Sequence, residues 1–240
     1  MEEKKKRIEI IDALRGFAVI LMVLHHALYN TAAFLGAPWW LYKNPVFDVL
    51  QALFIGLFIV ISGISSRFSR GNIERGSIVI VISVIITYVT LRMEMPIYFG
   101  ILHLLGFLMI FYGITRKFWD NIPRKAAPFI YIVLIIAGAL ARVYFSPTSD
   151  NPVLSDLLSV LGWRQKGFVN FDNQHILPWI FVYLFGTWVG EYIREGRFPS
   201  RFYEIKVSFF PFIGRNALLV YVLHQPVLFG ITMLIAYLIS

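Results

Sequence analysis

Arg15 and His26 lie on one face of a predicted helix in the stretch "IDALRGFAVILMVLHHALYN" near the start of the chain. They are eleven positions apart, which at about 100° per residue places them within about 20° of each other around the helix and about 16 Å apart along it. Asp12 and Asn30 join the same stripe, whereas His25 points away. Because ionisable groups in hydrocarbon are costly unless they are paired or solvated, this stripe predicts a polar track through a membrane.

The two residue types of this track suit group transfer. An imidazole is the commonest general base, and a guanidinium is suited to bind phosphate, so we assign His26 to chemistry and Arg15 to an anion. Each residue alone has a plainer explanation: Arg15 as an anchor that reaches the headgroups, and His26 as a hydrogen-bond donor to a neighbouring helix. Their shared face favours the functional interpretation.

Two other apolar segments place a histidine at a depth that matches His26. His103 lies in "IYFGILHLLGF" and His224 in "GRNALLVYVLHQPVL", so the three rings can meet in the outer half of a helix bundle. Either added imidazole would stabilise a developing oxyanion or hold an acceptor. A three-histidine metal site is the alternative, but the chain has no HxxxH spacing and Asp12 lies at another depth, so we expect no metal.

Hydroxyl and basic side chains gather at the opposite, cytoplasmic ends of the predicted helices. In "FIVISGISSRFSR", Gly63 and its neighbouring serines permit two helices to approach closely. Alternatively, the hydroxyls and guanidiniums form a binding site for a nucleotide phosphate. The candidate residues of this anion site are Arg15, Ser62, Ser65, Arg67, Arg215 and Asn216.

The segment "VNFDNQH" is polar and lies on the outer side, before the sixth apolar run. His175 suits a role at a polar rim or in substrate binding equally well. Because the segment is polar enough to meet a sugar, we take a glycan hydroxyl or amine as the acceptor. Its candidate contacts are Asn30, Asp172 and His175.

The composition shows that lipid surrounds these residues. Of 240 residues, 58% are hydrophobic and 15% are charged, against roughly half and a quarter in soluble domains. The chain has no cysteine, which excludes disulfides, thiolate metal sites and a cysteine nucleophile. The net charge of +8 is attributed to topology and to contact with the anionic lipids of the bilayer, and no nucleic acid is expected as a partner.

Seven apolar runs are each long enough to cross hydrocarbon about 30 Å thick. The predicted spans are 11–31, 46–67, 76–94, 97–115, 127–145, 176–193 and 216–238. We therefore predict an all-α integral membrane protein, multi-pass in the cell membrane, with a bundle of about seven transmembrane helices that forms a single domain over 1–240. The outer segment 146–174 contains "VLSDLLSVLGW", which predicts a short interfacial or re-entrant helix.

Lysines and arginines predict the orientation of the spans. The runs "KKKR", "TRKFWDNIPRK" and "REGRFPSRFYEIK" all fall in loops of one side. Because positively charged loops stay in the cytoplasm, the N-terminus is predicted to be cytoplasmic and the C-terminus outside. His26 then lies about two thirds of the way across the membrane.

Five motifs, in order over nearly the whole chain, resemble the short prokaryotic members of the heparan-alpha-glucosaminide N-acetyltransferase-like family, part of a wider superfamily of transmembrane acyltransferases. They are "IDALRGFAVILMVLHHALYN", "LFIVISGISSRFSR", "IYFGILHLLGF", "LPWIFVYLFG" and "GRNALLVYVLHQPVL". In that superfamily an Arg and a His with the spacing of Arg15 and His26 mark the active site. The resemblance also implies that Asn216 and His224 face the acyl-CoA, that acetyl-CoA binds from the cytoplasm, and that the protein is a homodimer.

One departure from the family concerns the catalytic histidine. The lysosomal enzyme has Asn at the position of His26, and its own catalytic His lies further along, where this chain has "FLGAPWW" without a histidine. The resemblance therefore transfers neither an acetyl-histidine intermediate nor glucosamine as acceptor to this chain by position.

Together these patterns predict a membrane-embedded acyltransferase that moves an acetyl group from cytoplasmic acetyl-CoA to an outer acceptor. Arg15, Arg67 and Arg215 would hold the nucleotide end, and His26 would act as the base in a direct transfer. An acyl-histidine intermediate is the alternative to direct transfer. The alternative is a carrier without chemistry, such as a flippase or a proton-coupled transporter whose histidines relay protons, although no inverted repeat is evident. A purely structural membrane subunit is the third possibility, but it would not need Arg15 and His26 on one face.

Overall fold

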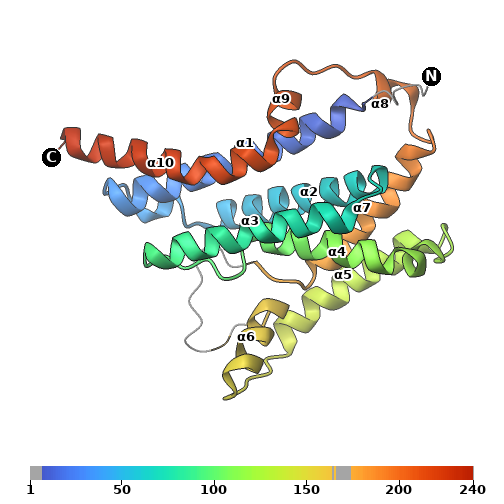
Figure 1. Ribbon diagram of the computed structural model, residues 1–240, viewed down its shortest axis with the longest axis horizontal. Coiled ribbons are helices and arrows are strands. Elements are labelled where there is room, and N and C mark those ends of the chain that lie inside the picture. Colours follow the sequence, from blue (N-terminus) through green and yellow to red (C-terminus); the bar gives the residue numbers. More distant parts are fainter. Residues whose placement is uncertain (1–6, 164, 166–173, 240) are drawn as a thin grey trace. The chain divides into compact units, whose positions relative to one another are not determined.

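Helices make up the regular structure of the described residues, 7–163, 165 and 174–239, in the computed structural model of the chain (Figure 1). In chain order they are α1 (Glu9–Phe34), the 3-10 helix η1 (Trp39–Leu41), α2 (Pro45–Phe68), α3 (Asn72–Arg92), α4 (Ile101–Asp120), α5 (Ala127–Tyr144), α6 (Pro152–Leu161), α7 (Trp179–Arg194), α8 (Ser200–Glu204), α9 (Phe210–Arg215) and α10 (Ala217–Ile239).

The predicted all-α membrane architecture is confirmed. Six stretches of the described chain are long and apolar enough to cross a membrane. They are Glu9–Phe34, Trp39–Phe68, Asn72–Arg92, Ile101–Asp120, Ala127–Tyr144 and Ala217–Ile239. The remaining predicted span coincides with α7, which has 16 residues, fewer than the roughly 20 that cross hydrocarbon without help. The count of about seven spans and the orientation of the termini stay predictions.

The fourth span begins later than predicted, at Ile101 rather than at residue 97. The hydroxyl of Thr87 donates to the carbonyl of Ile97 at 2.6 Å, and the Ile97 N–H donates to the hydroxyl of Thr90 at 3.2 Å. Because these side chains satisfy both main-chain groups of Ile97, the chain stays non-helical until Gly100, whose N–H donates to Nδ1 of His103.

The short helix predicted in the outer segment is confirmed as α6. Its N-cap is Asn151, whose side chain accepts from the N–H of Leu154 at 3.2 Å. Beyond its end, the indole of Trp163 donates to the carbonyl of Ala141 in α5 at 3.1 Å. Its place at the membrane interface stays a prediction.

The chain divides into two compact units, of which the first comprises Met1–Ile61 and Gly196–Ser240. In this unit α9 and α10 both pack against α1, so segments from the two ends of the chain lie side by side (Figure 1). The buried apolar residues of α1 include Ile11, Ala18 and Val19. α1 therefore carries its polar stripe within a packed group of helices.

The second unit comprises Ser62–Glu195, where α3 packs against α4 and α5 against α7. Tyr112 and Tyr183 are fully buried at its centre. The close helix approach predicted at Gly63 is confirmed, because a Cβ there would lie 2.2 Å from the carbonyl oxygen of Tyr183. The hydroxyls of Ser66 and Tyr183 are 2.6 Å apart, which joins the end of α2 to α7.

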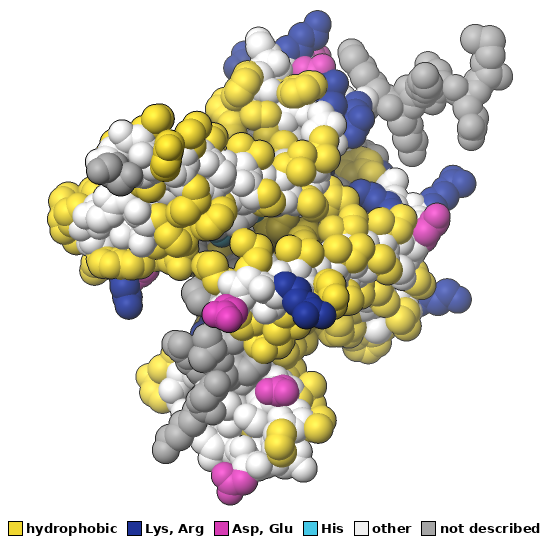
Figure 2. Space-filling view, turned by 60° about the vertical axis from the view of Figure 1, so that its left-hand side comes forward, with side chains coloured by type: hydrophobic (Ala, Val, Ile, Leu, Met, Phe, Trp, Pro, Cys, Tyr) yellow, Lys and Arg dark blue, Asp and Glu magenta, His cyan; other side chains and the backbone are white. Residues whose placement is uncertain are grey.

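Hydrophobic side chains cover much of the face shown in Figure 2. Large exposed apolar residues recur along α3, α5 and α10, among them Val84, Val133 and Leu234, each more than half exposed. In water such surfaces would favour association, whereas in lipid they are the expected outer surface of a transmembrane helix.

Candidate active site

Three guanidinium groups surround one buried carboxylate at the start of α1. Arg15 donates to Oδ1 of Asp12 at 2.8 Å, and Nε of Arg7 and Nε of Arg215 lie 3.0 and 3.6 Å from Oδ2. The Asp12 side chain is only 6% exposed, whereas those of Arg7 and Arg215 are 67% and 44% exposed. This cation cluster has more positive than negative charge, and its exposed guanidiniums can bind an added anion.

Two glycines bring Arg15 and Arg215 together. A Cβ at Gly16 would lie 2.1 Å from the carbonyl oxygen of Phe210, and one at Gly214 would lie 1.8 Å from the carbonyl oxygen of Asp12. The backbones of α1 and α9 are therefore in direct contact, which only glycine permits. Arg15 also donates to the carbonyl of Gly214 at 3.2 Å, so two arginines remote in sequence share one site.

His26 and His224 form a pair of imidazole rings between α1 and α10. Their centroids are 4.8 Å apart, and the rings meet edge to face at 76°. The structure thus brings together two of the three histidines that the sequence proposes for chemistry. Both belong to the first unit, and His26 lies on α1, the helix that also carries Arg15.

Hydrogen bonds within each helix determine the tautomer of the pair. Nδ1 of His26 is 2.9 Å from the carbonyl oxygen of Met22, and Nδ1 of His224 is 2.5 Å from that of Tyr221. A carbonyl oxygen only accepts, so each Nδ1 carries a proton and donates. In the neutral rings, Nε2 is therefore the nitrogen with the basic lone pair.

His25 has different surroundings from His26, as the helical phase predicts. It is buried, with its ring centroid 4.8 Å from that of Tyr42 and 5.8 Å from that of Phe54. The rings of the two adjacent histidines have centroids 6.0 Å apart, but His25 packs among aromatic rings whereas His26 meets His224.

Asn30 and Gln225 lie beside the histidine pair. The Gln225 side chain donates from Nε2 to Oδ1 of Asn30 at 3.2 Å. Sequence reasoning named Asn30 and missed Gln225, although a glutamine inside the apolar run "YVLHQPVLF" is itself an unusual intramembrane polar residue.

His103 belongs to the second unit and has structural partners there. Nδ1 accepts from the N–H of Gly100 at 3.3 Å, so Nε2 carries the proton and lies 3.2 Å from the hydroxyl of Thr87. Since the Thr87 hydroxyl in turn donates to the Ile97 carbonyl, the ring stabilises the connection between α3 and α4. The catalytic role assigned to His103 stays a prediction.

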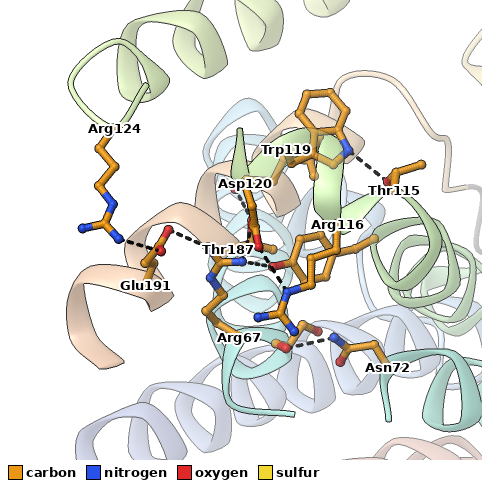
Figure 3. A network of polar contacts seen from close by, with 12 residues as sticks. Arg67, Asn72, Thr115, Arg116, Trp119, Asp120, Arg124, Thr187 and Glu191 are labelled. Atoms are coloured by element: carbon orange, nitrogen blue, oxygen red, sulfur yellow. Dashed lines mark hydrogen bonds and ion pairs between the residues drawn. The ribbon is translucent and has the colours of Figure 1, made fainter. Parts of the chain in front are cut away.

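Arg67 lies in an ion-pair network of the second unit (Figure 3). Its guanidinium donates to Asp120, to Glu191 at 2.5 Å and to the Tyr112 hydroxyl at 2.5 Å. The Arg67 side chain is only 3% exposed, and its charge is compensated by two carboxylates. Sequence reasoning missed these partners, although acidic residues at the ends of apolar segments were a visible signal.

The other predicted ligands of a nucleotide phosphate lie in α2 and at the junction of α9 and α10. Ser62 and Ser65 are half-buried in α2. Asn216 is exposed between α9 and α10, and its Nδ2 donates to the carbonyl of Phe212 at 2.9 Å. Their binding roles stay predictions.

His175 meets Arg142 of α5 at the start of the segment that leads into α7. The Arg142 guanidinium donates to Nε2 of His175, and the Trp179 ring centroid lies 6.3 Å from that of the imidazole. Burial, and then the positive charge of Arg142, lower the pKa of His175 to about 4. The ring is therefore neutral near pH 7. Asp172, its predicted neighbour in acceptor binding, lies outside the described residues.

Within the part of the chain that the structure describes, no three His, Asp or Glu side chains lie together as a metal site. The comparisons with known proteins point to a family instead. Residues 7–226 match the model of the family described as "Heparan-alpha-glucosaminide N-acetyltransferase, catalytic". No curated protein and no solved structure matches the chain. Because the match extends over nearly the whole length, from the cation cluster to the histidine pair, the chain belongs to this family of membrane acetyltransferases.

Proposed function

We propose that the protein transfers an acetyl group from cytoplasmic acetyl-CoA to a hydroxyl or amine acceptor on the other side of the membrane. One observation supports this most strongly: His26 and His224 are in contact, and in both rings Nδ1 donates to a helix carbonyl. That arrangement makes Nε2 the basic nitrogen of each ring. Two such bases within a helix pair suit proton transfer to and from a reacting acyl group.

The cation cluster is the proposed site for the phosphates of acetyl-CoA. Arg15 and Arg215 would supply charged hydrogen bonds to them. From Arg15, the helix rises about 16 Å to His26. The uncharged pantetheine arm would cover this distance past the partly exposed Met22 and so bring the thioester to the histidine pair.

The chemical step is a direct transfer. Nε2 of His26 removes the proton from the acceptor oxygen or nitrogen while that atom attacks the thioester carbonyl carbon. The carbon–sulfur bond then breaks, and the imidazolium returns the proton to the leaving CoA thiolate. Nε2 of His224 accepts a hydrogen bond from the acceptor substrate and so holds that substrate in position for attack. The homodimer implied by the resemblance stays a prediction.

The role of His26 is tested with the His26→Gln variant in membranes that receive labelled acetyl-CoA. We expect transfer of label to fall by at least about 100-fold, the usual contribution of a general base. His25→Gln is the matched control, because it removes the adjacent imidazole from a different environment. Since the chain has no cysteine, release of the CoA thiol can be followed with a thiol reagent without background from the protein. Equal turnover in folded His26→Gln and wild-type protein would exclude the proposed base.

The coenzyme site is tested with Arg215→Gln. Loss of one charged hydrogen bond, worth about 1.5 kcal/mol or more, predicts a rise of about tenfold or more in KM for acetyl-CoA. Arg201→Gln, an exposed arginine of α8, is the control and should leave KM unchanged. Added CoA should also raise the Tm of the wild-type protein. Identical melting with and without CoA would favour a carrier or a structural subunit over the enzyme.

A further inference from the structure

Two amide side chains form a second polar pair directly beside the histidines. Asn30 follows His26 by one helical turn, and Gln225 is the chain neighbour of His224. Asn30 is fully buried, at 0% exposure, and its Oδ1 accepts the hydrogen bond from Gln225 at 3.2 Å. The amide pair therefore shares the interface of α1 and α10 with the histidine pair.

Within the described part of the chain, the amide pair leaves one donor and one acceptor without a protein partner. Nδ2 of Asn30 and Oε1 of Gln225 are both buried and make no hydrogen bond to any described residue. The result does not depend on how the two amides are turned, since two amides that share one bond always leave an NH₂ on one and an oxygen on the other. Buried polar groups in proteins are nearly always satisfied, so this pair points to a ligand with matching groups.

The position of the pair indicates which substrate it meets. Asn30 lies about 6 Å beyond His26 along α1, on the side away from Arg15. A coenzyme held at the cation cluster would present its thioester at His26 and end there. The groups that meet Asn30 and Gln225 therefore belong to the acceptor.

We infer that the acceptor is an uncharged polyhydroxyl compound, such as a neutral sugar, whose neighbouring hydroxyls bind the amide pair. This inference rests on the proposed function. One hydroxyl oxygen accepts from Nδ2 of Asn30, and the next hydroxyl donates to Oε1 of Gln225. The oxygen of Gln225 would repel a carboxylate, and the NH₂ group of Asn30 would repel an ammonium group. A diol satisfies both groups at once.

The local structure of α10 allows access to this pair. Pro226 directly follows Gln225 and has no N–H to donate to the carbonyl of Val222. α10 therefore lacks one main-chain hydrogen bond at this level, and it can bend away from α1 here without breaking another.

The experiment compares three sugar acceptors of similar size: methyl glucoside, glucosamine and glucuronate. We expect the wild-type protein with acetyl-CoA to favour methyl glucoside by at least about tenfold in kcat/KM. Gln225→Met keeps the side-chain volume and removes the hydrogen-bonding oxygen Oε1. It should raise KM for methyl glucoside about tenfold and leave KM for acetyl-CoA unchanged. Asn30→Asp adds a negative charge and should shift the preference toward glucosamine by about tenfold.

Stabilisation by CoA separates failure of this inference from failure of the proposed function. CoA should raise the Tm of both variants as it does that of the wild-type protein, because the cation cluster is remote from the amide pair. With that shift present, a wild-type preference for a charged sugar, transfer to none of the three sugars, or an unchanged preference in Asn30→Asp would each overturn the inference. Absence of the shift in the wild-type protein would instead refute the proposed function.

Discussion

Replacement of Arg67 by methionine is expected to destabilise the protein without weakening coenzyme binding. The Arg67 side chain is 3% exposed, and its partners Asp120 and Glu191 are 35% and 16% exposed. Removing one member of a buried ion pair costs about 3–5 kcal/mol when the other charge is left alone. Here Asp120 keeps Arg116 at 3.3 Å and Glu191 keeps Arg124 at 3.2 Å, which favours the lower end, about 3 kcal/mol.

The measurement is the Tm of the purified protein in detergent, with and without CoA. At roughly 2–4 °C per kcal/mol for a chain of this size, Arg67→Met should melt about 6–12 °C lower than the wild-type protein. Arg124→Met is the control: its side chain is 47% exposed, so its ion pairs should contribute less than about 1 kcal/mol. CoA should raise the Tm of both variants equally.

The opposite pattern would refute this reasoning. If Arg67→Met melted like the wild-type protein but lost its stabilisation by CoA, Arg67 would be a ligand of the coenzyme phosphates, as the sequence pattern proposes. The ion-pair network would then contribute little to stability. The two measurements together therefore decide between a structural and a binding role for this arginine.

Two other predictions concern the contact of α1 with α9 and the pH dependence of stability. Gly16→Val should lower the Tm strongly and abolish the CoA shift, because a Cβ there would lie 2.1 Å from the Phe210 carbonyl oxygen. The control is Gly230→Ala, where an added Cβ meets no atom within 4 Å, and it should have the wild-type Tm or a slightly higher one. Equal melting of the two variants would contradict the backbone contact. Folding lowers the pKa of His175 from 6.5 to about 4, so as the pH falls the unfolded chain takes up a proton on this ring before the folded protein does. The contribution of the neutral His175 ring to stability is therefore complete above pH 6.5 and is lost as the pH falls toward 4. His175→Gln should remove this part of the pH dependence of the Tm, and an unchanged pH profile would show that the ring is not buried beside Arg142.

Much of the fold follows from local properties of the sequence. Apolar runs predict the helices within a few residues at most ends, because the length of an apolar run and the helical period are decided by near neighbours. The exception is instructive: the residues before Ile101 stay non-helical because Thr87 and Thr90, on the preceding helix, bond to the main chain of Ile97. No periodicity in the run itself signals that bond.

The same division holds at the candidate site. Helical phase alone puts Arg15 and His26 on one face and turns His25 away, since both are properties of a single helix. The choice of His224 as the neighbour of His26 depends on how α10 packs against α1, some two hundred residues later in the chain. The sequence pattern places His103 and His224 at matching depths, but it does not decide which of the two meets His26.

What the sequence by itself determined is thus the membrane environment, the helices and the polar face of α1. The tertiary structure alone decided which side chains meet: Gln225 with Asn30, and Arg67 with Asp120 and Glu191. The physical reason is that helix formation depends on interactions within a few residues. The partner of a buried charge or amide, in contrast, depends on the packing of helices that are remote in the sequence.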